Sequence, residues 1–174
     1  MKKVLFAALL LIGTSGAFAQ INKGQWLVGG NAGFNSSKWG EAKNTSFELS
    51  PDAGYFFAKQ FAGGLRASIT SSKDEGDEDA YSAVMVSPFV RYYFMPAANK
   101  LSIFADASYG FGSEGYDEKA KFSGFKVMAG PAVFLSPNTA LEFTLGYTSI
   151  KYKDIDDRAN SFGVNVGFQI HLGK

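Results

Sequence analysis

The sequence predicts an all-β protein, an eight-stranded antiparallel up-and-down β-barrel, and three observations support this fold class. Hydrophobic residues make up 46% of the 174 residues, but the mean hydropathy is −0.04, so apolar and polar residues must be closely interleaved. Two-residue alternation recurs along the chain, whereas the 3.6-residue period of an amphipathic helix is hard to find. Eight alternating segments are joined by connections that switch between short turns and longer polar loops.

The chain opens with the features of a secretory signal peptide. Lys2 and Lys3 form a basic start, residues 4–12 form a short apolar core, and Ala17 and Ala19 form a small-x-small cleavage site. A membrane-anchoring helix is the alternative, but the apolar run is about half of the roughly 20 residues that span a bilayer. Cysteine is absent, which excludes a lipoprotein anchor and disulfide bonds. We predict a signal peptide at 1–19 and one β-barrel domain at 20–174.

Eight segments are predicted to be strands because apolar residues occupy every second position. In the fifth, they occupy the odd positions from 101 to 111, and in the last they occupy the even positions from 162 to 172. Many segments exceed the usual soluble strand of about 5–6 residues and reach the roughly 9–11 residues that cross a membrane at a tilt. We place the strands near 24–36, 44–57, 61–71, 80–94, 100–112, 122–135, 139–153 and 160–173.

The connections between these segments alternate in length. Short turns on one side and long loops on the other are typical of an outer-membrane barrel, with the turns on the periplasmic side. An even number of strands places both chain ends on the turn side. We expect turns at 58–60, 95–99 and 136–139, and polar loops at 37–43, 72–79, 113–121 and 154–159.

A soluble β-barrel would also alternate, but with its apolar side inward. The lumen of an eight-stranded barrel is just wide enough to be filled by side chains. Glycine and serine fit that lumen, but the aromatic residues of the apolar side are too bulky for it: Trp26, Phe47, Tyr55, Phe57, Tyr92, Phe94, Phe143, Tyr147, Phe162 and Phe168. The polar side instead carries Glu48, Asp52, Arg66, Arg91, Asp106, Lys126 and Glu142. We therefore predict a transmembrane β-barrel whose apolar side faces lipid.

Aromatic residues on the apolar side gather near the two ends of the predicted strands. Girdles of this kind mark the two membrane–water interfaces of a transmembrane barrel. The group near the turns comprises Tyr55, Phe57, Phe61, Tyr92, Phe94 and Phe143. The group near the loops comprises Phe34, Trp39, Phe47, Tyr81, Tyr109, Phe111, Tyr147 and Phe162.

The stretch SPFVRYYF, residues 87–94, places Arg91 inside an apolar run, and the alternation turns Arg91 into the lumen. Counted from the turns, Arg91 and Glu142 lie low, Asp52, Arg66 and Asp106 at mid-height, and Glu48 and Lys126 high. Each layer contains both positive and negative side chains, so we predict a stacked network of ion pairs. Removing one partner of a pair would leave the other buried without a counter-charge. We expect Phe56, Phe89, Phe104, Met128 and Phe134 to fill the gaps. A conducting pore along these charges is the alternative, although porins need about 16–18 strands.

Three strands that run toward the turns share a proline pattern: SPDAGYFF (50–57), SPFVRYYF (87–94) and GPAVFL (130–135). A proline inside a strand breaks a ladder hydrogen bond, so we expect a bulge or bend at Pro51, Pro88 and Pro131. The stretch SPDAGYFFAKQFAGGLRASI, residues 50–69, resembles the outer-membrane β-barrel domain family, which is related to the small OmpA- and OmpX-like, porin-like barrels of Gram-negative bacteria. The resemblance covers residues 20–174 and lies in the pattern of strands and turns.

The resemblance implies a location in the cell outer membrane and insertion by the outer-membrane assembly machinery, which reads an alternating C-terminal strand. Residues 162–172 fit that signal, although the chain closes with Leu172-Gly173-Lys174 rather than a terminal aromatic residue. Proteins that resemble this family include adhesins and envelope-stabilising barrels. We expect a structural or surface-interaction role through the outer loops, with a narrow channel for small solutes as the alternative. Expected partners are outer-membrane lipid and lipopolysaccharide, and a surface partner at the loops.

We expect no enzyme activity and no catalytic, cofactor-binding or metal site; a membrane enzyme is the third alternative. His171, the single histidine, is predicted to face the lumen near the turn end, away from any lipid substrate. The acidic stretch from Asp74 to Asp79 lacks the ligand spacing of a calcium loop, and we interpret it as solvated, with divalent-cation bridging to lipopolysaccharide as the alternative. Without Lys2 and Lys3 the chain carries 15 basic and 16 acidic residues, so nothing suggests nucleic-acid binding.

Overall fold

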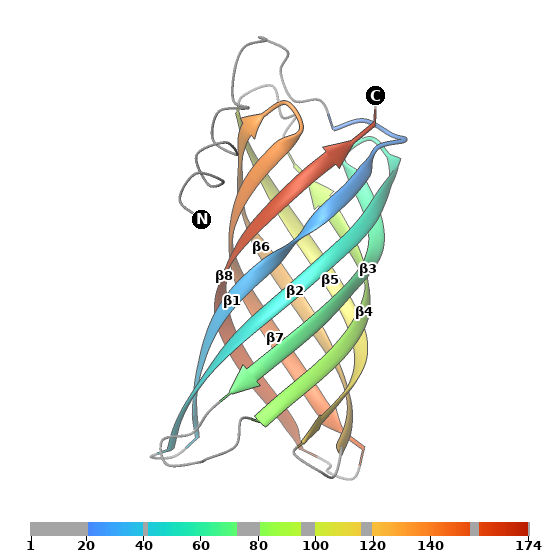
Figure 1. The fold of residues 1–174 in the computed structure, drawn as a ribbon. Coiled ribbons are helices and arrows are strands. Elements are labelled where there is room, and N and C mark those ends of the chain that lie inside the picture. The colour runs from blue at the N-terminus through green and yellow to red at the C-terminus, as the bar shows by residue number, and fades with distance from the viewer. Residues whose placement is uncertain are drawn as a thin grey trace, which may run out of the picture.

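The computed structural model describes residues 21–39, 42–72, 81–94, 100–115, 120–153 and 157–173. These residues form antiparallel strands that follow one another in chain order and close into a barrel where the last strand pairs with the first (Figure 1). The strands are β1 (Trp26–Trp39), β2 (Ala42–Ala58), β3 (Phe61–Ser72), β4 (Tyr81–Tyr93), β5 (Leu101–Gly115), β6 (Ala120–Ser136), β7 (Thr139–Tyr152) and β8 (Arg158–Leu172). The predicted fold class and strand number are confirmed, while the predicted signal peptide lies outside the described residues.

Both described ends of the chain lie at the same end of the barrel. Trp26, the first residue of β1, pairs with Leu172, the last residue of β8. The β2–β3 and β6–β7 turns lie at this end as well, beside the C-terminus in Figure 1. We call this the turn end and the opposite one the loop end, and the arrangement confirms the predicted placement of the termini.

Two of the predicted short turns are confirmed. Lys59 and Gln60 connect β2 to β3, and Gln60 adopts a φ of 64°, the left-handed conformation that a tight reversal requires. Pro137 and Asn138 connect β6 to β7. The pairing register shifts by a bulge just before the first turn, between Phe56 and Ala58, and β6 shows the same irregularity. The third predicted turn, at 95–99, lies outside the described residues.

Three of the predicted loops are shorter than the sequence suggested because strand pairing continues into them. β1 and β2 remain paired up to Trp39 and Ala42, inside the predicted loop 37–43. β5 continues to Gly115 and pairs with the start of β6, and β8 begins at Arg158. Residues 73–80, which include most of the predicted acidic loop, lie outside the described part of the chain. The hydrogen bonds between the two strands of a hairpin satisfy the backbone N–H and C=O groups whether the side chains are apolar or polar. A strand therefore does not end where the alternation of apolar and polar residues stops.

Successive side chains in each strand point alternately into the lumen and out of the barrel. In β5, Phe104 and Asp106 are buried whereas Tyr109 and Phe111 are exposed. The outer side is apolar, and Phe162 on β8 is 74% exposed. Among the described residues no helix is long and apolar enough to cross a membrane. The outward direction of the apolar side, predicted from the volume of its aromatic residues, is confirmed.

Of the bulge or bend predicted at each of the three prolines, the bulge is wrong. On the side of the following strand, the ladder lacks the pairs next to each proline, but the register is the same before and after the gap. Proline has no N–H to donate, so one bond is lost while the flanking pairs hold the alignment. On the opposite side each proline stays paired, as Gly30 with Pro51, Leu65 with Pro88 and Ile103 with Pro131. At the first gap the hydroxyl oxygens of Ser50 and Ser68 lie 2.8 Å apart.

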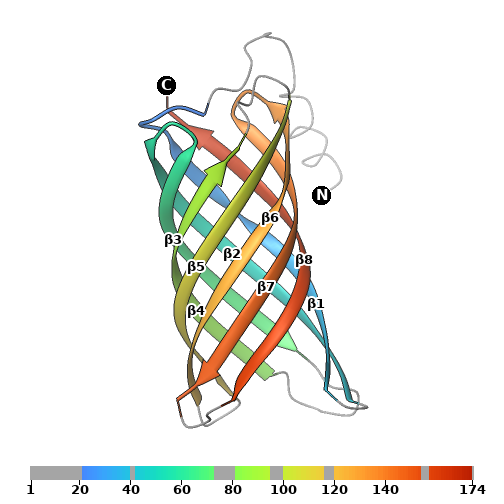
Figure 2. The ribbon, with the colours of Figure 1, turned by 180° about the vertical axis from the view of Figure 1, so that it is seen from behind.

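Aromatic side chains on the outer wall form one cluster near each end of the barrel. The turn-end cluster contains Phe57, Phe61, Tyr92 and Phe94, with ring centroids 4.8–6.0 Å apart. The loop-end cluster contains Phe125, Tyr147 and Phe162 and lies on β6, β7 and β8, which are side by side in Figure 2. Phe125 was not in the predicted girdle, and the side chains of Trp39 and Tyr81 lie outside the described part of the structure.

Candidate functional site

Arg91 lies at the centre of an ion-pair network that crosses the lumen. Its guanidinium donates to Asp106 at 3.0 Å and to both carboxylate oxygens of Glu142 at 3.0 and 3.1 Å. Arg66 donates to Asp106 through two nitrogens at 2.9 Å and to Asp52 at 3.1 Å. These side chains come from β2, β3, β4, β5 and β7, so the network joins most of the wall through the barrel axis.

Aromatic rings and two polar side chains complete the surroundings of the network. The Arg66 guanidinium lies 4.7 Å from the ring centroid of Phe89, and that of Arg91 lies 4.6 Å from the ring centroid of Phe104. The Tyr93 hydroxyl donates to Glu142 at 3.0 Å, and Gln169 donates to Asp52 at 3.0 Å. Stacking and hydrogen bonds of this kind offset the cost of removing these charges from water.

A second ion pair lies nearer the loop end. The Lys126 ammonium on β6 donates to a Glu48 carboxylate oxygen on β2 at 2.7 Å, and Ser50 donates to the same oxygen. The Glu48 side chain keeps 21% of its surface exposed, while the Arg66 and Arg91 side chains are almost fully buried. The predicted stacked ion-pair network is therefore confirmed, with one addition: Arg91 links the low layer to the middle layer by contacting both Glu142 and Asp106.

The turn end of the lumen is closed by an apolar plug. The plug is the buried cluster of Ile21, Leu27, Phe56, Ala62, Phe89, Tyr93, Phe104, Ala132, Phe134 and Ala140. His171 is buried beside it and contacts the rings of Phe56, Tyr93 and Phe134 edge-on, at 5.5–5.8 Å. The predicted position of His171 is confirmed, and it lies among rings rather than near the loop end.

Ile21 lies in the segment that precedes β1, and this segment folds over the turn end of the barrel. It is 3% exposed, and the backbone of this segment is held to β2 by bonds of 2.8 Å from Gly24 to Phe56 and 2.9 Å from Phe56 to Gln25. The start of the predicted mature chain is therefore part of the plug.

Replacing Ile21 by aspartate is expected to lower the unfolding free energy by about 1–2 kcal/mol. The change removes most of the roughly 1.5–3 kcal/mol gained by burying this side chain, and the released segment regains some chain entropy. Urea unfolding in detergent micelles measures the effect, with the exposed neighbour Lys23→Asp as the matched control. Equal midpoints for the two variants would mean that Ile21 does not contribute to closing the barrel.

Several buried polar atoms in the lumen have no hydrogen-bond partner among the described residues. They include both side-chain amide atoms of Asn31 and the hydroxyls of Ser87 and Thr144. Glycine packs closely against two of these groups, since a Cβ on Gly167 would collide with Asn31 and one on Gly110 would collide with Ser87. Buried polar atoms of this kind are normally satisfied by ordered water.

Sequence alternation identified the charged residues and fillers but not all of the contacts. The predicted fillers Phe56, Phe89, Phe104, Met128 and Phe134 are all buried in the lumen. Gln169, Tyr93 and Ile21 have functions in the network or plug that the sequence did not reveal. The inward position of Gln169 and Tyr93 followed from alternation, but their partners lie far away in sequence. Ile21 precedes the first strand and carries no periodic signal.

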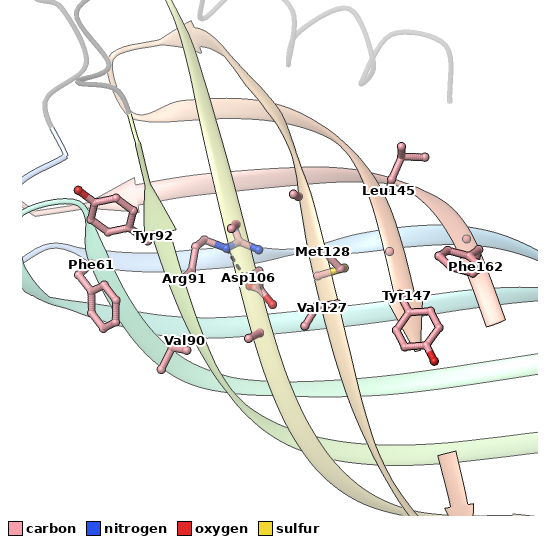
Figure 3. A pocket seen from close by; sticks show the side chains of 15 residues that line it. Phe61, Val90, Arg91, Tyr92, Asp106, Val127, Met128, Leu145, Tyr147 and Phe162 are labelled. Atoms are coloured by element: carbon pink, nitrogen blue, oxygen red, sulfur yellow. Dashed lines mark hydrogen bonds and ion pairs between the residues drawn. The ribbon is translucent and has the colours of Figure 1, made fainter. Parts of the chain in front are cut away.

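The outer wall carries an apolar groove of about 620 Å³ that crosses β4–β7 and ends on β3 and β8 (Figure 3). Three alanines, Ala105, Ala107 and Ala129, contribute small outward side chains to it. Figure 3 shows Phe61 and Tyr92 at one end of the groove and Tyr147 and Phe162 at the other. The groove therefore runs between the two aromatic clusters of the outer wall.

No group of three or more histidine, cysteine or carboxylate side chains within the described residues could hold a metal ion. Asp157 is exposed at the start of β8, and the remaining aspartates of its loop lie outside the described residues. The acidic stretch Asp74 to Asp79 also lies outside the described residues, so the solvated loop stays a prediction there and divalent-cation bridging stays its alternative.

Comparison with known proteins agrees with the geometry of wall and lumen. The crystal structure of Neisserial surface protein A superposes with a TM-score of 0.69 at 15% identity, covering 92% of this chain and 99% of that one. The outer membrane protein OprG from Pseudomonas aeruginosa gives a TM-score of 0.57 at 12% identity, covering 90% and 99%. No curated protein matches the sequence. The model of the outer membrane protein beta-barrel domain matches residues 4–169. The chain belongs to this family, and it is a barrel of the Gram-negative outer membrane.

Proposed function

We propose that the protein is a structural and surface-interaction barrel with a closed lumen, which contributes to envelope integrity or adhesion through its loop end. The observation that carries this proposal is the occupied axis: an apolar plug at the turn end, followed by the buried network around Arg66 and Arg91. A solute moving along the axis would have to separate charges that are paired within 3.1 Å. Such side chains join opposite walls and hold the barrel rigid.

The length of the strands supports a role at the surface. β2 and β6 each contain 17 residues. At a rise of about 3.3 Å per residue and a tilt near 40°, 17 residues span roughly 43 Å, whereas the apolar band of such barrels is about 25 Å tall. The paired strands therefore extend beyond the apolar band, and this extra length brings the loop end of the barrel within reach of other molecules at the cell surface.

A narrow channel is the second candidate, because the unpartnered atoms of Asn31, Ser87 and Thr144 favour water in part of the lumen. Planar-bilayer recording separates the two functions. The unmodified barrel is expected to give no steady conductance steps, because the plug and the network leave no continuous aqueous path. A porin of 16–18 strands, inserted under the same conditions, is the control that detects a path.

Reproducible steps from the unmodified barrel would overturn the closed-lumen proposal if they arise in the lumen. Lys126→Gln tests their origin, since Lys126 lies in the lumen and pairs with Glu48 across the barrel. Steps through the lumen would change in size or ion selectivity in this variant. Conductance steps of unchanged size and ion selectivity would instead indicate leakage between the barrel and the lipid, and they would not contradict the closed-lumen proposal.

A further inference from the structure

Two parallel rows of outward residues define the groove on the outer wall. In one row, Tyr92 pairs with Ala105, Ala105 with Ala129, and Ala129 with Leu145. In the other, Val90, Ala107, Val127, Tyr147 and Phe162 are successive partners. Because barrel strands are tilted by about 35–45°, rows in the pairing direction climb the wall obliquely. The groove therefore leads from the turn-end aromatic cluster to the loop-end aromatic cluster.

The shape of this groove suits an extended hydrocarbon chain. Alanine side chains form its middle, while Phe61, Tyr92, Leu145 and Phe162 form its ends. Its volume of about 620 Å³ lies within the range of sites that hold whole small molecules. On a wall that faces lipid, the molecule available to fill an apolar groove is an acyl chain.

Basic side chains lie directly beyond the loop end of the groove, on the same outer face. Lys121 and Lys153 are exposed partners at the ends of β6 and β7, and Lys151 and Arg158 are paired on β7 and β8. We call these four residues the basic cluster. The described acidic residues nearby are Asp157 and Glu114, and Glu114 lies beside Tyr152 of β7 and next to the β5 partner of Lys121. Among the described residues, four cations therefore face two carboxylates, which leaves an excess of positive charge.

Arg158 joins the basic cluster to the aromatic end of the groove. Its guanidinium lies 5.5 Å from the ring centroid of Phe125, and its Nε donates to the Ser149 hydroxyl at 2.9 Å. The Phe125 ring in turn contacts Tyr147, which lines the groove. Going from the groove toward the loop end, an acyl chain would meet apolar wall, then aromatic rings, and then cations. This order matches a lipid whose anionic headgroup lies at the outer surface.

We propose that the groove and the basic cluster together form a binding site for one lipopolysaccharide molecule of the outer leaflet. An acyl chain occupies the groove between Ala107 and Tyr147, and the phosphates of the saccharide headgroup contact Lys151, Arg158 and Lys121. This inference goes beyond the proposed function, because it rests on the outer wall and is independent of whether the lumen conducts.

The charge half of the site is tested by the triple variant Lys121→Gln/Lys151→Gln/Arg158→Gln. The matched control, Lys23→Gln/Lys59→Gln/Lys100→Gln, removes the same charge from exposed positions at the turn end. Refolded protein in detergent is titrated with purified lipopolysaccharide and followed by microscale thermophoresis. The loop-end variant is expected to bind roughly tenfold or more weakly, because three cations near the phosphates are lost, while the control keeps its affinity.

The apolar half is tested by Ala107→Phe, which fills the groove and leaves the basic cluster intact. Ala53→Phe adds the same ring at an exposed outer position of β2 and is the control. We expect Ala107→Phe to weaken lipopolysaccharide binding by at least about threefold, because the acyl chain loses its contact with the wall. A gel shift between heated and unheated samples verifies that each variant is folded.

Three results would overturn the proposal. Equal loss of affinity in the loop-end and turn-end charge variants would indicate general electrostatic attraction. Equal binding of dephosphorylated lipopolysaccharide or of phosphatidylglycerol would exclude specific recognition of the phosphorylated saccharide. Cross-linked dimers that Ala107→Phe abolishes while lipopolysaccharide affinity stays unchanged would assign the groove to a second copy of the chain.

Discussion

Replacing Arg91 by methionine is expected to destabilise the folded barrel by about 3–5 kcal/mol. Arg91 makes two hydrogen bonds to Glu142 and one to Asp106, and all three side chains are buried. Asp106 keeps Arg66 as a partner, but Glu142 is left with the Tyr93 hydroxyl. A buried carboxylate without its cation bears most of its desolvation cost. Urea unfolding of the refolded protein in micelles, monitored by tryptophan fluorescence, measures the loss.

The double variant Arg91→Met/Glu142→Gln distinguishes a stranded charge from a packing defect. Neutralising Glu142 removes the uncompensated carboxylate, so this variant is expected to recover at least half of the stability that Arg91→Met loses. Lys126→Met is the matched control, because the Glu48 carboxylate that it leaves behind is partly exposed to water. That variant should lose less stability than Arg91→Met, because water and the Ser50 hydroxyl still reach the Glu48 carboxylate. A double variant no more stable than Arg91→Met would show that the charge was not the cause.

Replacing Gly130 by alanine is expected to be among the most damaging single-methyl additions to the wall. A Cβ at Gly130 would overlap the backbone carbonyl oxygen of Phe143 on the neighbouring strand, which cannot move without shifting β7. Gly130 directly precedes Pro131, where the β6–β7 ladder already lacks pairs. We expect a loss of about 3 kcal/mol or more, beyond the typical cost of overpacking, and a reduced fraction of heat-modifiable barrel on a gel.

Gly146→Ala is the control for this steric argument. A Cβ at Gly146 would meet Met128 Cγ at 3.3 Å and the Asn165 side-chain nitrogen at 3.5 Å, and both groups belong to flexible side chains. This variant should fold with less than about 1 kcal/mol of change, since the neighbours can rotate away. If both alanine variants folded equally well, close approach of the β7 carbonyl would not explain the glycine at position 130.

The sequence predicted which residues of each strand face lipid and which face the lumen, because this alternation is a relation between adjacent residues. Each strand residue faces either lipid or lumen, and a one-residue error would place Arg91 in hydrocarbon and Val90 in the lumen. The same alternation assigned the charged residues Asp52, Asp106 and Glu142 to the lumen side of the wall. Their pairing by sign and height could be predicted because few charged groups occupy the narrow lumen.

The errors also have physical causes. Polarity near residues 37–43 was interpreted as a loop, whereas a hairpin ladder needs only backbone groups and continues in polar sequence. The prolines were expected to mark a bulge or bend, but no bulge forms, because the register depends on the flanking pairs, which remain intact around Pro51, Pro88 and Pro131. Both errors arose from taking a side-chain signal as evidence about backbone pairing.

The amino-acid order alone determined the number of strands, which face of each meets lipid, and which ionic groups enter the lumen, because alternation acts between adjacent residues. Tertiary structure alone decided that Arg91 bridges Glu142 and Asp106, that Ile21 belongs to the plug, and that small side chains on β5 and β6 align into a groove below the basic cluster. These contacts depend on the tilt of the strands and on the register of every strand pair around the barrel. A local sequence pattern does not specify the total register offset, which is fixed when β8 pairs with β1.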